Sequence, residues 1–254
     1  MQRPYILMAL PCYNEAENLP DLLKGFESLN FRYGSVFEVK VIVIDDCSKD
    51  NTTEVLKNLN LDLDFKVVRH EVNKNLMGGI NTAFNIFHEN MSDPCPAVGY
   101  ALMDGDNTHS PFHLIEMLPK IYQGFDVVVA SRYRPGSRVC GVSWWRQILS
   151  FAVAVMFRVL RNVQGVWDYS CGYRLYSPRI VKEIKTRLPG DVAKEKSFAC
   201  MVEILVKLSI VGAKCTEVPM LLRYDQKLGE SKMEFRKTIL GTFKQLLTLW
   251  KVRV

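Results

Sequence analysis

The 254-residue sequence lacks an apolar run that is long enough to cross a membrane. A spanning helix needs about 18 or more consecutive apolar residues. The longest candidate, residues 148–157, is bounded by Arg146 and Arg158 and is too short. Polar residues follow the apolar start of the chain at once, which argues against a signal peptide. We therefore expect neither a spanning helix nor export from the cytoplasm.

Paired cysteines and a dinucleotide motif are also absent. The seven cysteines are scattered and never spaced as C-x-x-C, so the sequence indicates neither a zinc site nor a disulfide framework. This usage favours a reducing, cytosolic compartment. No G-x-G-x-x-G motif is present, which excludes the usual dinucleotide fingerprint.

Positive charge is only in slight excess. The net charge is +6 and the pI is about 8.9. This bias favours anionic partners such as nucleotides, phosphates or acidic lipid surfaces. It is too small to indicate nucleic acid, and we expect no nucleic-acid partner.

Apolar strand-like segments alternate with helical segments in the first half of the chain. The clearest is residues 39–45, VKVIVID, a short, continuous and β-branched run that is typical of a buried strand. The alternation predicts βαβ units and therefore an α/β fold, a mostly parallel central sheet flanked by helices. The predicted strands are residues 5–10, 39–45, 65–70, 99–104 and 125–131, and helices follow at about 17–29, up to 59, 79–90 and 111–122.

The second half of the chain has a different pattern. Residues 143–163 and 233–252 are predicted helices that are apolar on one side and basic on the other. Between them we predict a turn-rich stretch (168–178), a helix (195–211) and a short strand (215–219). No linker separates the halves, so we expect one domain with a C-terminal helical extension.

Polar residues follow three of the predicted strands, at 10–15, 45–50 and 104–106. Ligands bind beyond the carboxyl ends of parallel strands, so these segments are expected to converge on one crevice. Asp45 and Asp46 can accept hydrogen bonds from a ribose or a base. Taken alone, the same stretch is explained equally well as a capped helix start.

Asp104 and Asp106 flank Gly105 directly after the fourth predicted strand. Like charges this close repel each other, and a hard divalent cation with oxygen ligands would remove the repulsion. An acidic turn in solvent explains the same residues. The pattern alone leaves both interpretations open.

The combination of motifs is more specific than any one of them. PCYNE (11–15), DDCSKDNT (45–52) and DGD (104–106), each after its own strand, resemble the family-two glycosyltransferases of the GT-A fold. The resemblance implies a Rossmann-like GT-A sheet and Mg²⁺ or Mn²⁺ as the cofactor. The implied nucleotide-sugar residues are Pro11, Tyr13, Glu15, Asp46 and Asp104, and the implied metal residues are Asp104, Asp106 and Asn107.

Motifs of the second half resemble the polyprenyl-phosphate glycosyltransferases, the dolichol-phosphate mannose synthase-like branch. They are ASRYRPGS (130–137), SWWRQILS (143–150), DYSCGYRLYS (168–177) and VPMLLRYDQKLGESKM (218–233). That branch holds the lipid phosphate with residues that correspond to Arg132, Arg146 and Ser150. Independently, arginine forks suit phosphate oxygens, and Arg146 and Ser150 share one helix face.

Further basic residues complete the expected acceptor site. We expect Arg174, Lys227 and Lys232 at the acceptor phosphate as well. The chain departs from the R-x-x-G-x-S-K pattern of relatives by carrying Gln226 at the arginine position. Lys227, Arg223 or Lys232 could supply that charge, and the sequence leaves the choice open.

The expected chemistry depends on whether a general base is present. Residues 191–204 contain no Glu-Asp dyad of the kind that sugar-acceptor relatives carry, although Asp191, Glu195 and Glu203 are possible bases. An acceptor phosphate is largely a dianion near neutral pH and needs no base. We therefore predict an inverting single displacement, with Asp104, Asp106 and Arg132 as catalytic residues.

The favoured function is metal-dependent transfer of a sugar, mannose or glucose, from a GDP- or UDP-linked donor to a polyprenyl or dolichyl phosphate. A soluble transferase acting on a sugar or protein hydroxyl is an alternative that requires a base at Glu203 or Asp191. A non-catalytic nucleotide-sugar-binding or membrane-associated scaffold is another. A sugar-1-phosphate nucleotidyltransferase is disfavoured, because its glycine-rich N-terminal loop is missing.

A lipid acceptor also explains the basic, tryptophan-containing helices, which suit the interface of a membrane. Packing of these helices on the domain is the alternative. We expect a peripheral protein on the cytoplasmic face of a membrane. We divide the chain into a catalytic domain (1–232) and a C-terminal amphipathic helix (233–254). The domain would comprise a nucleotide-sugar half (1–131) and an acceptor half (132–232).

Overall fold

The computed structural model describes residues 3–229 of the chain. The strands of the main sheet are β1 (Tyr5–Cys12), β2 (Glu38–Asp45), β3 (Phe65–Arg69), β4 (Gly99–Leu102), β5 (Val127–Ser131), β7 (Arg174–Tyr176) and β8 (Cys215–Pro219). A small sheet contains β6 (Arg138–Cys140) and β9 (Leu221–Arg223). The α-helices are α1 (Leu19–Tyr33), α2 (Thr52–Asn58), α3 (Asn75–Asn90), α4 (Leu114–Tyr122), α5 (Trp144–Arg161), α6 (Pro178–Arg187) and α7 (Cys200–Ile210). Two 3₁₀ helices are η1 (Pro111–His113) and η2 (Tyr224–Gln226).

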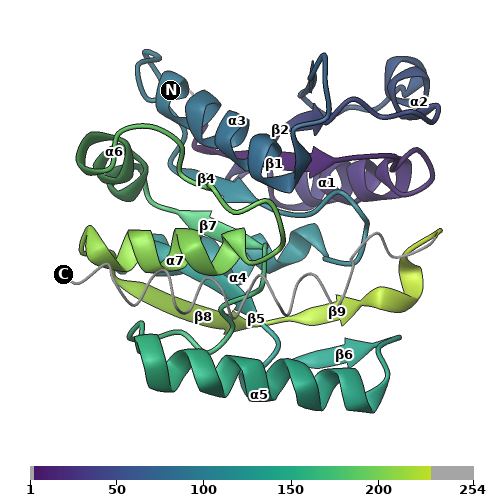
Figure 1. Ribbon diagram of the computed structural model, residues 1–254. Helices are drawn as coiled ribbons and strands as arrows, with labels where there is room; N and C mark the ends of the chain where they lie inside the picture. Colours follow the sequence, from purple (N-terminus) through teal and green to yellow (C-terminus); the bar gives the residue numbers. More distant parts are fainter. Residues whose placement is uncertain (1–2, 230–254) are drawn as a thin grey trace.

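The main sheet has the strand order β3-β2-β1-β4-β7-β5-β8 and is flanked by helices (Figure 1). Among the described residues, β7 is the single strand of this sheet that runs against the others. It pairs antiparallel with β4 and β5, whereas the other pairs are parallel. The predicted α/β fold with a mostly parallel sheet is confirmed.

Strands β1 and β2 lie side by side in the sheet and contribute much of its buried apolar surface. All eight residues of β1 are buried, and the alternate valines of β2 at positions 39, 41 and 43 are at most 1% exposed. A parallel strand that is covered on both faces requires a continuous buried run such as that of β1. Cys12 is the register partner of Asp45, so β1 and β2 end side by side.

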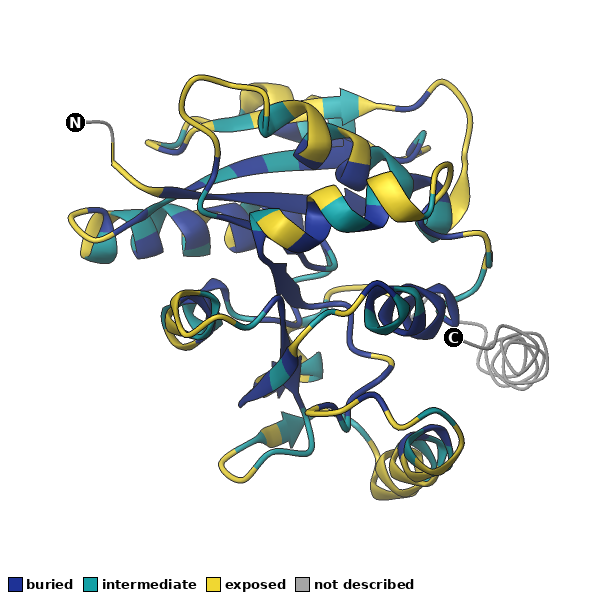
Figure 2. Ribbon diagram, turned by 90° about the vertical axis from the view of Figure 1, so that its left-hand side faces the viewer, coloured by how far each residue is buried: buried dark blue, intermediate teal, exposed yellow. Residues whose placement is uncertain are grey.

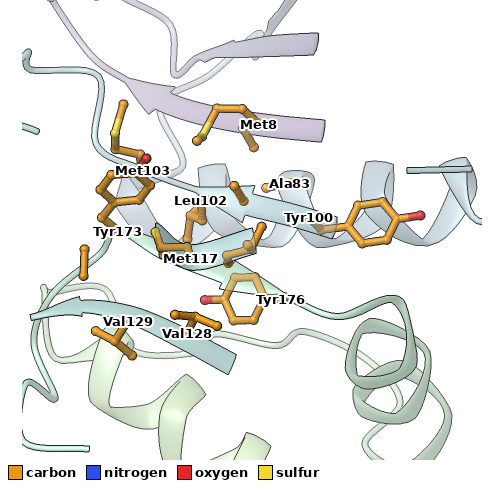
Figure 3. Packing of buried hydrophobic residues seen from close by; sticks show 14 of the residues in the cluster. Met8, Ala83, Tyr100, Leu102, Met103, Met117, Val128, Val129, Tyr173 and Tyr176 are labelled. Atoms are coloured by element: carbon orange, nitrogen blue, oxygen red, sulfur yellow. The ribbon is translucent and has the colours of Figure 1, made fainter. Parts of the chain in front are cut away.

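The core continues from β4 through β7 into the second half of the chain. Tyr100 of β4 and Tyr176 of β7 are register partners, and both are fully buried. The Tyr176 ring lies 5.2 Å from the ring of Phe84 in α3, between centroids. Figure 3 shows Tyr176 of β7 and Val128 of β5 as members of the same buried cluster. One hydrophobic cluster therefore joins both halves of the chain.

The structure contains elements that the sequence pattern did not predict. β7 lies inside the predicted turn-rich stretch 168–178, and α6 was not predicted. β6, β7 and β9 have three residues each, which is too short to show the alternation that marks a strand. The predicted strand 215–219 is confirmed as β8, while the predicted helix 195–211 begins only at Cys200. The predicted helix 233–252 lies outside the described residues.

The small sheet brings a late part of the chain to the end of β4. His109 forms an isolated bridge with Leu222 of β9. The N–H of Arg223 donates to the carbonyl oxygen of Thr108 at 2.9 Å. The residues after β9 therefore start beside the D-G-D turn.

Helix α5 exposes apolar side chains on its outer face. They recur every three or four residues and are 37–77% exposed: Trp144, Ile148, Phe151, Val155 and Val159. The opposite side of the helix buries Ala154 and Phe157. In Figure 2 this helix, at the foot of the molecule, is exposed along the side that faces away from the sheet. Within residues 3–229, no helix combines the length and the apolar character that crossing a bilayer requires.

Candidate functional site

The loops that follow β1 and β2 interlock at the carboxyl edge of the sheet. The N–H of Asp46 donates to the carbonyl oxygen of Cys12, and the N–H of Asn14 donates to Ser48 Oγ, both at 2.9 Å. Asn14 and Cys47 have φ values of 54° and 60°, in the left-handed region. Asparagine tolerates this region better than most residues other than glycine. The first two polar segments of the sequence therefore form one structure.

Asp46 is buried and fixed by two neighbours. Its Oδ1 lies 2.7 Å from His70 Nδ1 and accepts a hydrogen bond from the N–H of Lys74 at 2.8 Å. The other ring nitrogen of His70 lies 2.9 Å from Thr82 Oγ1. His70 was not among the predicted site residues. It follows β3, and only the pairing of β2 with β3 brings it to Asp46.

The predicted donor residues Pro11, Tyr13 and Glu15 lie at the end of β1 and in the loop after it. Pro11 is buried in β1, where a side chain at Gly79 would contact its ring, and Tyr13 is half-buried. Glu15 is 7% exposed, and its Oε2 accepts a hydrogen bond from Asn18 Nδ2 at 2.7 Å. A donor contact by these residues stays a prediction.

The D-G-D turn lies directly on the end of β1. A Cβ atom at Gly105 would lie 3.0 Å from the Cβ of Cys12, which is closer than most such contacts. Glycine therefore allows Asp104 and Asp106 to approach the loop after β1. The predicted convergence of the three polar segments is present in the structure.

The two carboxylates of this turn have different protonation properties. Burial, followed by the charge of Asp106, raises the pKa of Asp104 to about 7, while Lys227 opposes the rise. Burial alone would raise the pKa of Asp106 too, but Lys227 and His109 hold it below its usual value. Two carboxylates that share one site are expected to differ in this way.

Thr108 and His109 support Asp106 from the next positions in the chain. Thr108 Oγ1 donates to Asp106 Oδ1 at 2.7 Å, and His109 Nδ1 lies 3.0 Å from Thr108 Oγ1. Burial lowers the pKa of His109 to about 4, so the ring is neutral near pH 7. Asn107 is half-buried with a φ of 59°, and a metal contact from it stays a prediction. The sequence reasoning missed the roles of Thr108 and His109.

Of the three basic residues that the sequence left as alternatives, Lys227 lies at the D-G-D turn. Lys227 Nζ lies 2.8 Å from Asp106 Oδ2. Arg223 instead pairs with Asp225 at 2.8 Å, on the surface. Lys232 lies outside the described residues. Lys227 is thus placed at the predicted metal carboxylates rather than at Arg132.

The oxygen donors fit a hard divalent cation with an incomplete protein ligand set. Asp104 and Asp106 form a carboxylate pair in which burial, and then the charge of Asp106, raises the pKa of Asp104. Within residues 3–229, no group of three or more His, Cys, Asp or Glu side chains has metal-binding geometry. Mg²⁺ is commonly bound by one or two carboxylates together with substrate phosphates and water. The residues therefore fit a cation that arrives with a diphosphate.

Arg132 lies at the end of β5 and is held by a buried carboxylate. Its Nε and one Nη2–H donate to the two oxygens of Asp168 at 2.8 and 2.6 Å, and Nη2 also donates to Ser170 Oγ at 2.7 Å. Asp168 is fully buried, whereas the Arg132 side chain is 21% exposed. The backbone N–H of Asp168 is in turn held by Glu217 Oε1 at 2.7 Å. Asp168 is the first residue of the motif DYSCGYRLYS, and the sequence alone did not predict its role.

The two segments predicted to bind the acceptor phosphate meet in the structure. Tyr133 Oη lies 2.8 Å from Ser150 Oγ, and the Arg132 guanidinium lies 5.4 Å from the Tyr133 ring centroid. Arg146 is exposed one helical turn before Ser150, with its guanidinium 5.2 Å from the ring of Trp145. Arg132 and Ser150 are therefore on one continuous surface.

The structure does not support Arg174 as a phosphate ligand. Arg174 is fully buried in β7. Its two Nη atoms donate at 2.8 Å to the carbonyl oxygens of Met201 and Tyr169. This prediction is corrected: Arg174 ties β7 to its neighbours inside the core and lies beyond the reach of a soluble or lipid phosphate.

Glu203, one of the candidate bases of the second half, is engaged in structural contacts. Glu203 Oε2 accepts hydrogen bonds from the N–H groups of Lys194 and Glu195, both at 2.9 Å. Its other oxygen pairs with Lys207 at 2.7 Å, and the residue is 4% exposed. Asp191 is exposed. Glu203 therefore fixes the turn before α7, which does not suit a general base.

Comparison with known proteins adds independent information. The profile described as Glycosyl transferase family 2 matches residues 8–185. Polyprenol monophosphomannose synthase of Mycolicibacterium smegmatis is 28% identical over 237 residues, covering 89% of this chain and 80% of that protein. Undecaprenyl-phosphate mannosyltransferase of Micrococcus luteus is 28% identical over 232 residues, covering 90% and 87%. Dolichol-phosphate mannosyltransferase of Pyrococcus furiosus is 27% identical over 97% of this chain, which spans 64% of that relative.

Solved structures resemble the whole described architecture. Glucosyl-3-phosphoglycerate synthase from Mycobacterium tuberculosis, in complex with Mn²⁺, UDP and phosphoglyceric acid, has a TM-score of 0.68 and 13% identity. The match covers 99% of this chain and 80% of that one. The same enzyme with Mg²⁺ and UDP has a TM-score of 0.67. At this identity the likeness concerns the fold, and it confirms the predicted GT-A architecture.

Proposed function

As a member of glycosyl transferase family 2, this chain is a glycosyltransferase, and we propose that its acceptor is a polyprenyl phosphate. In the proposed reaction a divalent cation supports transfer of mannose or glucose from a nucleotide-sugar, with inversion at the anomeric carbon. The distant relatives named above are polyprenyl-phosphate mannosyltransferases, which makes mannose the first sugar to test.

The observation that carries the acceptor assignment is the grouping of Arg132, Tyr133 and Ser150. Arginine side chains bind phosphate oxygens in a planar, two-point geometry. Arg132 is oriented by Asp168 through its Nε and Nη2 atoms. Among the described residues, no hydrogen-bond partner is found for its Nη1, which leaves that edge of the guanidinium for an anion.

The state of Glu203 supports the same acceptor. A transferase that acts on a hydroxyl needs a general base to take up its proton. Glu203 is buried and satisfied by two N–H groups and Lys207. An acceptor phosphate is already anionic and needs no such base.

The donor is proposed to lie across the carboxyl ends of β1, β2 and β4. Asp46 would accept hydrogen bonds from the nucleoside, while Asp104 and Asp106 would hold Mg²⁺ or Mn²⁺ on the diphosphate. The bound cation would stabilise negative charge on the leaving diphosphate.

The proposed displacement needs no covalent intermediate. An oxygen of the acceptor phosphate forms a bond to the anomeric carbon. The bond from that carbon to the donor diphosphate breaks, and the nucleoside diphosphate leaves with the electron pair. Arg132 would position the attacking phosphate, and positioning of this kind accounts for a large part of enzymatic rate enhancement.

The outer face of α5 supports access to a lipid. Its exposed apolar side chains include Trp144 and Ile148, at 74% and 61% exposure. Tryptophan and arginine side chains are common where a protein lies in a membrane interface. We infer a peripheral position of the enzyme on the cytoplasmic face of a membrane.

A transfer assay tests the proposal. Radiolabelled GDP-mannose, UDP-glucose and related donors are incubated with polyprenyl phosphate and Mg²⁺ or Mn²⁺, or with EDTA. We expect one donor to label the lipid and EDTA to abolish labelling. Arg132→Met should lower the rate by about 100-fold or more, whereas the surface variant Arg187→Gln should match the wild type. Absence of lipid labelling with every donor would contradict the proposed acceptor.

A further inference from the structure

Lys227 lies among three carboxylates at the predicted metal site. Its Nζ is 2.8 Å from Asp106 Oδ2, with the two side chains only 10% and 15% exposed. Burial would lower the pKa of Lys227, but Asp106 and then Glu15 raise it above its usual value. Lys227 also acts electrostatically on Asp104. The ammonium group therefore already neutralises part of the charge that a divalent cation would neutralise.

The loop that carries Lys227 is attached at two places. Before it, the N–H of Arg223 donates to Thr108 beside the D-G-D turn. After it, Asn18 Oδ1 accepts a hydrogen bond from the N–H of Leu228 at 2.9 Å, and Asn18 Nδ2 donates to the carbonyl oxygen of Leu228 at 3.1 Å. We call residues 223–228 the strap. It crosses from the D-G-D turn to the loop after β1.

The position of Lys227 is therefore set by the fold. Asn18 also donates to Glu15 Oε2 at 2.7 Å, so the strap is anchored to one of the three carboxylates. Among residues 3–229, Lys227 is the single basic side chain within ion-pairing distance of Asp106. The Lys227 ammonium is therefore held beside one carboxylate of the predicted cation site.

From this geometry we propose that Lys227 occupies the cation site until the donor binds, and that it couples the binding of the cation to that of the donor diphosphate. The inference rests on the cation site of the proposed function. A divalent cation on Asp106 requires Lys227 Nζ to leave that oxygen. The diphosphate provides a new anionic partner for the displaced ammonium.

Electrostatics explains why the two cations exclude each other without the donor. An ammonium and a divalent ion on neighbouring oxygens repel strongly in a partly buried site. A lysine is a compact charge on a flexible stem, so its Nζ can change partner while the strap stays attached. A cation that enters alone must displace the Lys227 ammonium from Asp106 while no new anion is present to pair with it. A cation that enters with a diphosphate supplies the compensation, and linkage requires that each then strengthens the binding of the other.

Direct measurement of Mn²⁺ binding tests this proposal without any measurement of turnover. Free Mn²⁺ is followed by electron paramagnetic resonance during titration of the full chain, with and without UDP or GDP. Without nucleotide, we expect Lys227→Met to bind Mn²⁺ about tenfold more tightly than the wild type, because a competing charge is gone. With nucleotide, the gain should disappear, because Lys227 then contributes to diphosphate binding.

Three further variants separate charge from structure. Lys227→Arg keeps the charge and should bind Mn²⁺ as the wild type does. Asn18→Ala removes the strap's anchor without changing any charge, and should raise Mn²⁺ affinity without nucleotide by a few-fold. Arg223→Gln removes a basic side chain of the same strap that, within residues 3–229, forms its ion pair with Asp225, and this variant should leave Mn²⁺ affinity unchanged.

The outcomes are distinct from those of the transfer assay. Equal or weaker Mn²⁺ binding by Lys227→Met without nucleotide would overturn the proposal, as would equal effects of Lys227→Met and Arg223→Gln. Failure of every form to bind Mn²⁺, with or without nucleotide, would overturn it together with the cation site. If Mn²⁺ binding follows the expected pattern but no lipid is labelled, only the proposed acceptor is wrong.

Discussion

At the scale of single residues, two aspartates show how surroundings set protonation. Burial and the nearby Asp106 raise the pKa of Asp104 to about 7. Burial would also raise the pKa of Asp126, but hydrogen bonds from Arg179 and the N–H of Lys214 hold it below its usual value. One carboxylate therefore takes up a proton readily in the folded state, and the other does not.

The Asp104→Asn variant should reveal this difference as a change of stability with pH. The folded protein binds a proton on Asp104 more tightly than the unfolded chain, so stability from this group decreases as pH rises towards its folded pKa. In EDTA, we expect the stability of wild type relative to Asp104→Asn to fall between about pH 5 and about pH 7. The fall should be at most about 1.4 kcal/mol per pH unit, levelling off above pH 7.

Urea unfolding at several pH values measures this effect, and Asp126→Asn is its control. Asp126 is ionised in both the folded and unfolded states over this range. The stability difference between wild type and Asp126→Asn should therefore stay constant. A constant difference for Asp104→Asn as well would show that the Asp104 pKa is not raised.

Asp168 should be essential because it compensates the charge of Arg132. Its substitution by asparagine leaves a partly buried guanidinium without its carboxylate, which typically costs about 3 kcal/mol or more of unfolding free energy. We expect Asp168→Asn to lose both stability and lipid labelling. Arg132→Met combined with Asp168→Asn should be more stable than Asp168→Asn alone but remain inactive. Urea unfolding of the wild type, the two single variants and the double variant measures the coupling between Arg132 and Asp168. Additive changes in unfolding free energy would contradict this coupling.

Some residues of the site could be predicted from neighbouring sequence, whereas others depend on partners that are far away in the sequence. Asp46, Asp104 and Asp106 follow strands directly, so the rule for parallel sheets could place them. His70 and Asp168 act by holding another side chain at a distance of 24 and 36 residues in the sequence. No periodicity links such positions, because only strand pairing and loop packing bring them together.

At the scale of elements, α5 is unusual because its apolar stripe faces outward. Trp144 and Ile148 lie one turn apart on this stripe and are 74% and 61% exposed. Their replacement removes little packing inside the molecule. Burial of one such side chain in a lipid interface is worth about 1.5–3 kcal/mol.

Replacement of both residues by serine should therefore separate membrane binding from stability. We expect Trp144→Ser with Ile148→Ser to weaken binding to anionic phospholipid vesicles by tenfold or more, about 1.4 kcal/mol or above. The urea midpoint should hardly change. Phe31→Ser, which removes a 91% exposed aromatic from α1, is the matched control and should bind vesicles as the wild type does. Cosedimentation with vesicles measures the binding of each form. Equal binding by the wild type and both variants would contradict a role of α5 in membrane binding.

The predictability of the elements follows their length and burial. β1 and β5 are fully buried runs, and β2 is apolar except at Glu38, Lys40 and Asp45. The sequence predicted each of these strands to within a few residues. β7 could not be recognised, because three residues carry no periodicity and its place depends on partners far away in the sequence. The same applies to β6 and β9, which pair with each other in the small sheet.

At the scale of the whole molecule, the nucleotide-sugar and acceptor halves share one sheet. β5 belongs to the first half, but both of its partners, β7 and β8, belong to the second. The predicted boundary at residue 131 therefore does not separate two folded units, because strands from both sides of it pair in one sheet. The boundary at 232 lies outside the described residues and stays a prediction.

A fragment of residues 1–131 should not fold on its own, because β5 would have no partner. We expect its far-ultraviolet circular dichroism to change without a cooperative transition in urea. A fragment of residues 1–232 contains every described strand and should unfold in one transition, as most compact single units do. A cooperative transition in the shorter fragment would show that the halves fold independently.

The position of β5 also has a consequence for how the chain is made. Ribosomes release the N-terminal part first, and nascent chains fold as their segments become available. β5, with the apolar sequence VVVAS, leaves the ribosome before β7 and well before β8. Until those strands emerge, both of its edges can hydrogen-bond to another nascent chain. Slow translation between residues 131 and 219 would lengthen this interval, so the yield of soluble protein should depend on codon choice there and on chaperones that cover exposed strands.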